Sequence, residues 1–181
     1  MKLRKTLRTV ILVALLNCST FCMAQKQNLN RLITAIATVE SELNEKAVSG
    51  DCAGYLQIRP ILVKECNDIL KKKEIKKRYT LSDRFSKKKS IAMFYLIQEK
   101  FNPSHSIERA LWVWNAGPYA KKRPTEYINK VMKEYNKIQK IASVFEKKPD
   151  FFKSTNNVLV HIFDNYMMFN YKIPYMHKVC G

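Results

Sequence analysis

Apolar residues recur three and four positions apart along most of this chain, which is the spacing of one face of an α-helix. The clearest case is the set Ile107, Ala110, Leu111 and Trp114, which fall at i, i+3, i+4 and i+7. The same spacing predicts helices over about residues 29–43, 60–70, 86–101, 106–116 and from 125 onward. The pattern therefore predicts an all-α fold.

Residues that favour helix ends stand at several of these boundaries. Pro60 suits the first position of a helix, and Ser106 is an acceptable N-cap. At the other end of the fourth helix, Gly117 can take the left-handed conformation that closes a helix, and Pro118 prevents its continuation.

The last expected helix carries a heptad-like apolar stripe opposite a lysine face: Ile128, Val131, Tyr135, Ile138, Ala142 and Phe145. Such a stripe fits either packing on the core of the same domain or a coiled-coil partner. The repeat is short, which favours packing on the domain's own core. Residues 149–181 are too apolar for a disordered tail, and we expect them to dock on the domain or on a partner.

The N-terminal segment predicts export. Basic residues at positions 2, 4, 5 and 8 precede the apolar run Val10–Leu16, and Cys22-Met23-Ala24 has the small-x-small form of a signal-peptidase site. The run is much shorter than the roughly 20 residues that cross a bilayer, which argues against a membrane anchor. Leu15-Leu16-Asn17-Cys18 resembles a lipobox, although Asn17 fits that motif poorly. We expect a periplasmic or cell-envelope protein with a signal peptide at 1–24, one domain at 25–148 and an apolar extension of unknown role at 149–181.

The chain is strongly basic, with 33 Lys and Arg against 15 Asp and Glu. Removal of residues 1–24 takes away four basic groups and leaves a net charge of about +14. In the cytoplasm such a charge would indicate nucleic acid, but an exported chain meets the acidic polymers of the cell envelope. The basic runs 71–73, 76–78 and 87–89 are equally consistent with solvated helix faces. The charge favours an anionic substrate without naming it, and we expect no nucleic-acid partner.

Glu40 occupies an unusual place on the first expected helix. Ile33 and Ile36 precede it at helical spacing, so its carboxyl lies on the apolar face. A carboxylic acid can donate a proton near neutral pH only if its pKa is raised, and burial raises it. Glu42 and Glu45 turn away from that face and are expected at the surface. The alternative for Glu40 is an ordinary helical glutamate, since Glu is a good helix former.

Three short blocks carry a family resemblance. They are Glu40-Ser41, Gly54-Tyr55-Leu56-Gln57 and Asn115-Ala116-Gly117. In this order they resemble the Glu-Ser, Gly-x-x-Gln and Asn-Ala-Gly motifs of the lytic transglycosylases and goose-type lysozymes. The resemblance covers about residues 29–131 and implies a lysozyme-like single domain that cleaves peptidoglycan.

The resemblance also implies roles for individual residues. Glu40 would be catalytic, and the substrate-binding residues would be Ser41, Gly54, Tyr55, Gln57, Asn115, Gly117 and Tyr127. Gln57 would present its amide to the sugar chain, and Tyr127 resembles a late tyrosine of the family that reaches the catalytic glutamate. Ser41 could instead be helix surface, and Asn115 and Gly117 could simply end a helix. Trp114 and Tyr55-Leu56 depart from the residues common in the family and bear on subsite preference.

In lytic transglycosylases one glutamate performs both proton transfers, so that a 1,6-anhydro ring closes without water. The resemblance implies this chemistry for Glu40. Asp51 is the nearest candidate for the second carboxylate of a hydrolase, but Gly50-Asp51 is more simply a turn. A goose-type hydrolase is one alternative, and a glycan-binding or secretion-apparatus scaffold with little activity is another.

Export would leave three cysteines in a compartment where disulfides persist: Cys52, Cys66 and Cys180. Cys52 precedes the Gly54 block and Cys66 faces inward on the next helix, so we predict a disulfide between them. The alternative is that Cys66 is a buried small hydrophobe. His161 and His177 have no ligand cluster around them, and we expect neither a metal nor a cofactor. The expected partner is the peptidoglycan strand, bound by a monomer whose tail could dock an envelope or secretion-apparatus protein.

Overall fold

The computed structural model describes residues 28–147, with side chains described through residue 144. The predicted signal peptide, the lipobox-like segment and the C-terminal extension lie outside the described residues. The chain divides after Asn136 into two compact units. The first unit holds every element up to the first half of the last helix.

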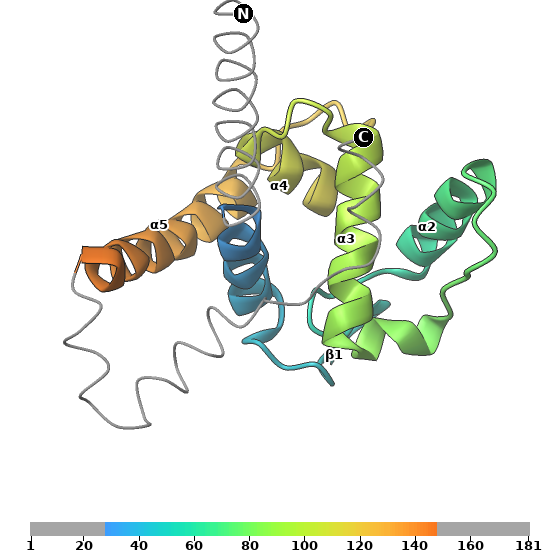
Figure 1. The fold of residues 1–181 in the computed structure, drawn as a ribbon, viewed down its shortest axis with the longest axis horizontal. Coiled ribbons are helices and arrows are strands. Elements are labelled where there is room, and N and C mark those ends of the chain that lie inside the picture. Colours follow the sequence, from blue (N-terminus) through green and yellow to red (C-terminus); the bar gives the residue numbers. More distant parts are fainter. Residues whose placement is uncertain (1–27, 148–181) are drawn as a thin grey trace, which may run out of the picture. The chain divides into compact units, whose positions relative to one another are not determined.

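Helices make up most of the described chain (Figure 1). The first, called here the Glu40 helix, covers residues 28–41. The elements that follow are β1 (Val48–Ser49), β2 (Cys52–Ala53), α2 (Pro60–Lys72), the 3-10 helix η1 (Leu81–Phe85), α3 (Lys87–Phe101), α4 (Ile107–Ala116) and α5 (Thr125–Lys147). The prediction of a mainly α-helical fold is confirmed. Within residues 28–147 no helix has the length and apolar content that crossing a membrane requires.

The helix boundaries follow the predicted signals closely. Pro60 begins α2, and the Ser106 hydroxyl caps α4 by accepting a hydrogen bond from the backbone N–H of Arg109 at 3.3 Å. Gly117 closes α4 with φ of 90°, and its N–H donates to the Val113 carbonyl at 3.1 Å. Local sequence signals therefore determine where these helices start and stop.

The Glu40 helix ends two residues earlier than predicted. Glu42 and Leu43 take φ angles of 53° and 66°, which turn the chain out of the helix. The Leu43 N–H donates to the Ala37 carbonyl at 3.2 Å, a bond that closes the last turn as a left-handed C-terminal motif does. Since Glu and Leu are good helix formers, their helical propensity predicted the opposite conformation.

The core is centred on α3, which lies between α2 and α4 and contacts both (Figure 1). Phe94 of α3 is fully buried, and its ring centroid lies 4.9 Å from that of Trp114 on α4. On the Glu40 helix, Ile33 and Ile36 are also buried. Val131 of α5 is fully buried within the first unit, as expected if the stripe packs on the domain's own core.

A short antiparallel hairpin follows the Glu40 helix and was not predicted. Val48 pairs with Ala53, and Ser49 pairs with Cys52, while Gly50 and Asp51 form the turn. The turn itself was predicted from Gly50-Asp51. The strands are only two residues long, so no alternation of apolar and polar residues could reveal them.

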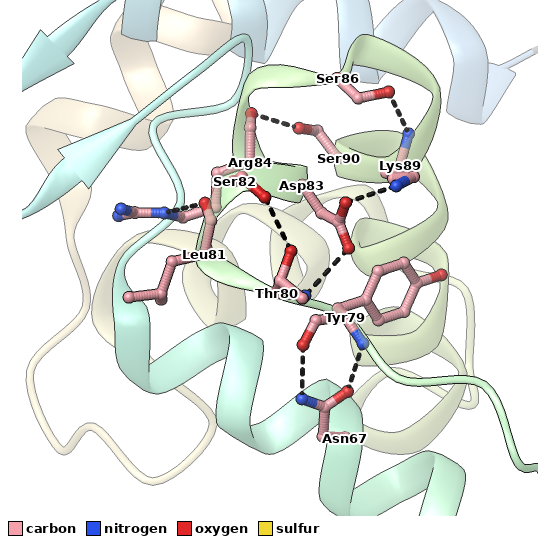
Figure 2. A network of polar contacts seen from close by, with 10 residues as sticks. All are labelled: Asn67, Tyr79, Thr80, Leu81, Ser82, Asp83, Arg84, Ser86, Lys89 and Ser90. Carbon is pink, nitrogen blue, oxygen red and sulfur yellow. Dashed lines mark hydrogen bonds and ion pairs between the residues drawn. The ribbon is translucent and has the colours of Figure 1, made fainter.

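The basic segment between α2 and α3 is pinned by side chains rather than left as a loose connection (Figure 2). The Asn67 side chain donates to the Tyr79 carbonyl at 2.9 Å and accepts from the Tyr79 N–H at 2.7 Å. The Asp83 carboxylate accepts from the Thr80 N–H at 2.9 Å and pairs with Lys89. These bonds hold η1 in place, an element that the sequence did not predict.

The predicted disulfide between Cys52 and Cys66 is not present, and both residues are free thiols. Helix α2 directs the buried Cys66 toward α3, where its thiol lies 3.7 Å from the Met93 carbonyl oxygen. Cys52 lies half-buried in β2. Burial and the neighbouring Glu65 raise the pKa of the Cys66 thiol to about 12, as fits the alternative that Cys66 is a small core residue.

Candidate active site

A cavity of about 230 Å³ opens where the Glu40 helix, the hairpin with its following loop, α2 and α4 meet. It is lined by Glu40, Cys52, Gln57, Arg59, Leu62, Trp114 and Asn115. Three of the residues predicted for the site, Glu40, Gln57 and Asn115, therefore come together although they are far apart in the sequence. Asp51, the candidate second carboxylate, is an exposed turn residue and does not line this cavity.

Glu40 is half-buried at the end of its helix. Burial raises the pKa of its carboxyl above the ordinary value, because the charged form loses hydration. The Tyr127 hydroxyl and the cations of Lys130 and Arg59 oppose this effect. The surroundings thus favour the proton on Glu40 while keeping the carboxylate form accessible.

Tyr127 approaches Glu40 from the first turn of α5. Burial, followed by the negative charge of Glu40, raises the pKa of the Tyr127 hydroxyl well above its ordinary value, so this group remains a donor. The hydroxyl is buried and makes no hydrogen bond of ordinary geometry within the described residues. It is therefore available to a carboxylate at Glu40 or to a bound sugar oxygen.

The Gly54–Gln57 segment is a tight loop closed by two backbone hydrogen bonds between Ala53 and Ile58, at 3.2 and 2.9 Å. The two residues in its middle, Tyr55 and Leu56, are 1% and 0% exposed and belong to the core. Gln57 returns to the cavity with φ of 47°. Its side-chain amide nitrogen donates to the Ala47 and Gly54 carbonyls at 3.1 and 3.0 Å, which leaves the side-chain carbonyl oxygen, Oε1, for a ligand.

Ser41 connects the Glu40 helix to this loop. Its hydroxyl lies 2.8 Å from the Tyr55 carbonyl and 3.1 Å from the Ala37 carbonyl, and it can donate to either. The side chain is buried, so the alternative of a helix-surface serine is wrong. Ser41 joins two of the three sequence blocks by a direct bond and fixes the loop relative to Glu40.

Arg84 of η1 also holds the Gly54–Gln57 loop, by hydrogen bonds to the residues on either side of it in the sequence. One guanidinium nitrogen donates to the carbonyls of Asp51 and Ile58, at 2.9 and 3.1 Å. The Arg84 carbonyl accepts from the Ser90 hydroxyl at 2.8 Å (Figure 2) and lies against Gly54. A Cβ atom at Gly54 would meet this carbonyl oxygen at 1.7 Å, so only glycine fits there.

The remaining predicted residues lie around the cavity rather than on its lining. Gly54 packs on Arg84, and Gly117 ends α4 directly after the Asn115-Ala116 pair. The ring of buried Tyr55 lies under the Lys87 ammonium, 4.9 Å from the ring centroid. In the structure these residues shape the walls that carry Gln57 and Asn115.

Arg59 is the site residue that the sequence analysis missed. It precedes α2, is exposed, and donates a long hydrogen bond of 3.4 Å to the Asn115 carbonyl. The basic runs at 71–73, 76–78 and 87–89 indicated other cations as the candidates for binding an anionic substrate. The sequence carried no signal for Arg59, because this residue lies outside the three blocks and outside the basic runs.

This arrangement can transfer a proton to and from a bound sugar. Glu40 is a carboxyl with a raised pKa, and the Gln57 and Asn115 side chains offer polar atoms in the same cavity. Within residues 28–147 no cluster of three His, Cys, Asp or Glu side chains is arranged to hold a metal ion. A half-buried carboxyl of raised pKa beside polar side chains has the properties of a general acid and base.

The comparison with protein-family models gives a match to the transglycosylase SLT domain over residues 17–138. This range includes all residues that line the cavity and also Tyr127 and Lys130. Neither the curated proteins nor the solved structures gave a match.

Proposed function

Because the chain belongs to the transglycosylase SLT domain family, we propose that it cleaves the β-1,4 bond between N-acetylmuramic acid and N-acetylglucosamine, with Glu40 as the single catalytic residue. Family membership supports peptidoglycan cleavage of the transglycosylase type in general. The observation that carries the assignment of Glu40 is its position as a half-buried carboxyl of raised pKa in the same cavity as Gln57 and Asn115.

In the first step Glu40 acts as an acid. It gives its proton to the glycosidic oxygen while the bond from that oxygen to C1 of the muramic acid breaks, through a transition state resembling an oxocarbenium ion. The raised pKa favours the proton on Glu40 before this step.

In the second step the same group acts as a base. The Glu40 carboxylate removes the proton from the 6-hydroxyl of the muramic acid, whose oxygen then bonds to C1 and closes a 1,6-anhydro ring. Arg59, Lys130 and the Tyr127 hydroxyl stabilise the carboxylate between the two steps. The cavity lining contains no second carboxylate within the described residues, which favours ring closure over hydrolysis.

Two polar side chains hold the sugars in this proposal. The free carbonyl oxygen of Gln57 accepts from an N–H or O–H of the strand, and the exposed Asn115 amide donates to one of its oxygens. From the expected signal peptide at 1–24 we also propose that this activity takes place outside the cytoplasm, where peptidoglycan lies.

The test of Glu40 is the conservative substitution Glu40→Gln, which keeps the shape but removes the transferable proton. Activity on purified peptidoglycan should fall by a factor on the order of 10² to 10⁴. Glu42→Gln is the matched control, because Glu42 is an exposed carboxylate two residues away. Equal losses in the two variants, or a folded Glu40→Gln protein that digests peptidoglycan well, would show that the assignment is wrong.

The product separates ring closure from hydrolysis. Mass spectrometry of the digest should find strands that end in 1,6-anhydro-N-acetylmuramic acid, about 18 Da lighter than hydrolytic products because no water is added. Ends that borohydride reduces, at the full hydrolytic mass, would establish the goose-type hydrolase instead.

A further inference from the structure

Arg59 has most of its hydrogen-bonding capacity unused. A guanidinium carries five N–H donors, and Arg59 uses one of them in the long bond to the Asn115 carbonyl. The side chain is exposed, lines the Glu40 cavity and forms no ion pair within the described residues. Its remaining donors are therefore available to a ligand bound in this cavity.

A second cation reinforces this charge. Lys130 of α5 is exposed, and like Arg59 it lies close enough to Glu40 to stabilise the carboxylate form. Within the described residues, the cavity lining offers Glu40 as its sole acidic side chain. When Glu40 is protonated, as the first chemical step requires, the positive charge of Arg59 has no counter-charge on the cavity lining within the described residues.

Uncompensated cations beside a sugar-binding cavity attract an anionic substituent on the sugar. The guanidinium fork matches the geometry of a carboxylate. Every second sugar of a peptidoglycan strand carries a lactyl group. In a peptide-free strand this group ends in a carboxylate, and in a peptide-bearing strand the carboxylates lie further out on the peptide.

We propose that Arg59 is a substrate-binding residue that recognises a carboxylate of the glycan strand, and that the Glu40 cavity therefore selects carboxylate-bearing strands over neutral ones. This inference rests on the proposed substrate class. It adds the chemical feature of that substrate which this chain recognises next to the bond that is cut.

The experiment measures binding in a Glu40→Gln background, so that it does not depend on cleavage. Three soluble probes are compared: peptide-free strands, the same strands with their carboxyls converted to neutral methylamides, and peptide-bearing strands. Arg59→Gln is added to the background, and Lys64→Gln serves as the matched control, because Lys64 is an exposed cation on α2 that does not line the cavity. Arg59 has φ of −81° and ψ of 152°, so glutamine fits without backbone strain.

The expected result is that peptide-free strands bind about tenfold more tightly than their methylamides, the size of one charge-assisted interaction. Arg59→Gln should remove most of this difference, Lys64→Gln should leave it, and added salt should narrow it. A preference for the peptide-bearing strands that also depends on Arg59 would assign the carboxylate to the peptide. Equal binding of charged and neutral strands, or equal effects of the two substitutions, would overturn the proposal.

Cleavage by the otherwise native chain separates this inference from the proposed function. Arg59→Gln should raise KM for charged strands much more than for their neutral methylamides, and any loss of kcat from the weaker support of the Glu40 carboxylate should be the same on both. A residue that only positions Asn115 or Glu40 would lower kcat on every strand without a selective change in KM. A chain that cleaves no strand but still discriminates by charge refutes the proposed function and leaves the inference standing. A chain that cleaves charged and neutral strands equally well refutes the inference and leaves the proposed function standing.

Discussion

Substitution of Gly54 by alanine tests whether the loop that carries Gln57 depends on its contact with Arg84. Gly54 has φ of 79°, and an L-residue held in this region loses about 1–2 kcal/mol. The added Cβ would also lie 1.7 Å from the Arg84 carbonyl oxygen, where real contacts of this kind do not fall below 3.0 Å. The two atoms must separate by more than about 1 Å, and the clash is with backbone rather than with a flexible side chain.

The cost of this displacement follows from the hydrogen bonds that it weakens. Moving the Arg84 carbonyl weakens its bond from the Ser90 hydroxyl, and moving Arg84 weakens the bonds to the Asp51 and Ile58 carbonyls. Each such bond contributes about 1 kcal/mol net. Together with the backbone cost, Gly54→Ala should destabilise the protein by about 3–5 kcal/mol.

Gly50→Ala is the matched control. Gly50 also has a positive φ, of 55°, but nothing lies within 4 Å of the position of its missing Cβ. Only the backbone cost of about 1–2 kcal/mol applies. Urea unfolding followed by circular dichroism measures both variants, and thermal scans should show a fall in Tm several times larger for Gly54→Ala. Equal losses of stability would refute the argument that close packing against Arg84 demands glycine.

Three further outcomes follow from the charges and thiols of the site. Burial raises the folded-state pKa of Glu40, so its protonated form stabilises the fold below the ordinary glutamate pKa, and this contribution is lost as pH rises through the raised value. Glu40→Gln should therefore raise the free energy of unfolding at pH 7.5 and leave it unchanged at pH 4. A gain in stability that is the same at both pH values would contradict this. Tyr127→Phe removes a hydroxyl that lowers the pKa of Glu40, so the alkaline limb of the pH profile of kcat/KM should move to higher pH. A shift to lower pH would show that the Tyr127 hydroxyl does not act on the Glu40 carboxyl. Iodoacetamide at pH 8 should label the half-buried Cys52 in the native protein, as peptide mapping would show. It should label the buried Cys66, whose pKa is about 12, only after unfolding. Labelling of Cys66 in the native protein would contradict its buried position.

The parts of the fold that depend on neighbouring residues could be read from the sequence. The helical period put Glu40 on an apolar face, and the Ser106 and Gly117 signals gave the ends of α4. These features are local, because a helix repeats every few residues and its caps lie next to it. The structure agrees with them for that reason.

The parts that depend on distant contacts could not be read in this way. The segment that leads into η1 is held by two hydrogen bonds between Asn67 and Tyr79, which lie 12 positions apart. The disulfide prediction failed for a related reason: an inward-facing Cys66 was predicted correctly, but its neighbour across the core is α3.

The candidate site shows the same division. Gln57 and Asn115 were found through the sequence blocks, whereas Arg59 belongs to no block and is recognised only by the cavity that it shares with Glu40. The role of Ser41 needed the structure as well, because its bond to the Tyr55 carbonyl joins residues 14 positions apart.

The spread of the site along the chain has a consequence for how the protein matures. Glu40 emerges early from the ribosome, whereas Arg84, which clamps the loop, follows 44 residues later, and Tyr127 and Lys130 emerge later still. A contact between such distant residues can form only after the later residue has been synthesised, and long-range contacts form slowly. The proposed site is thus completed in the last stage of folding, and a nascent or truncated chain that ends before Thr125 carries Glu40 without Tyr127 and Lys130, two of the groups that lower its pKa.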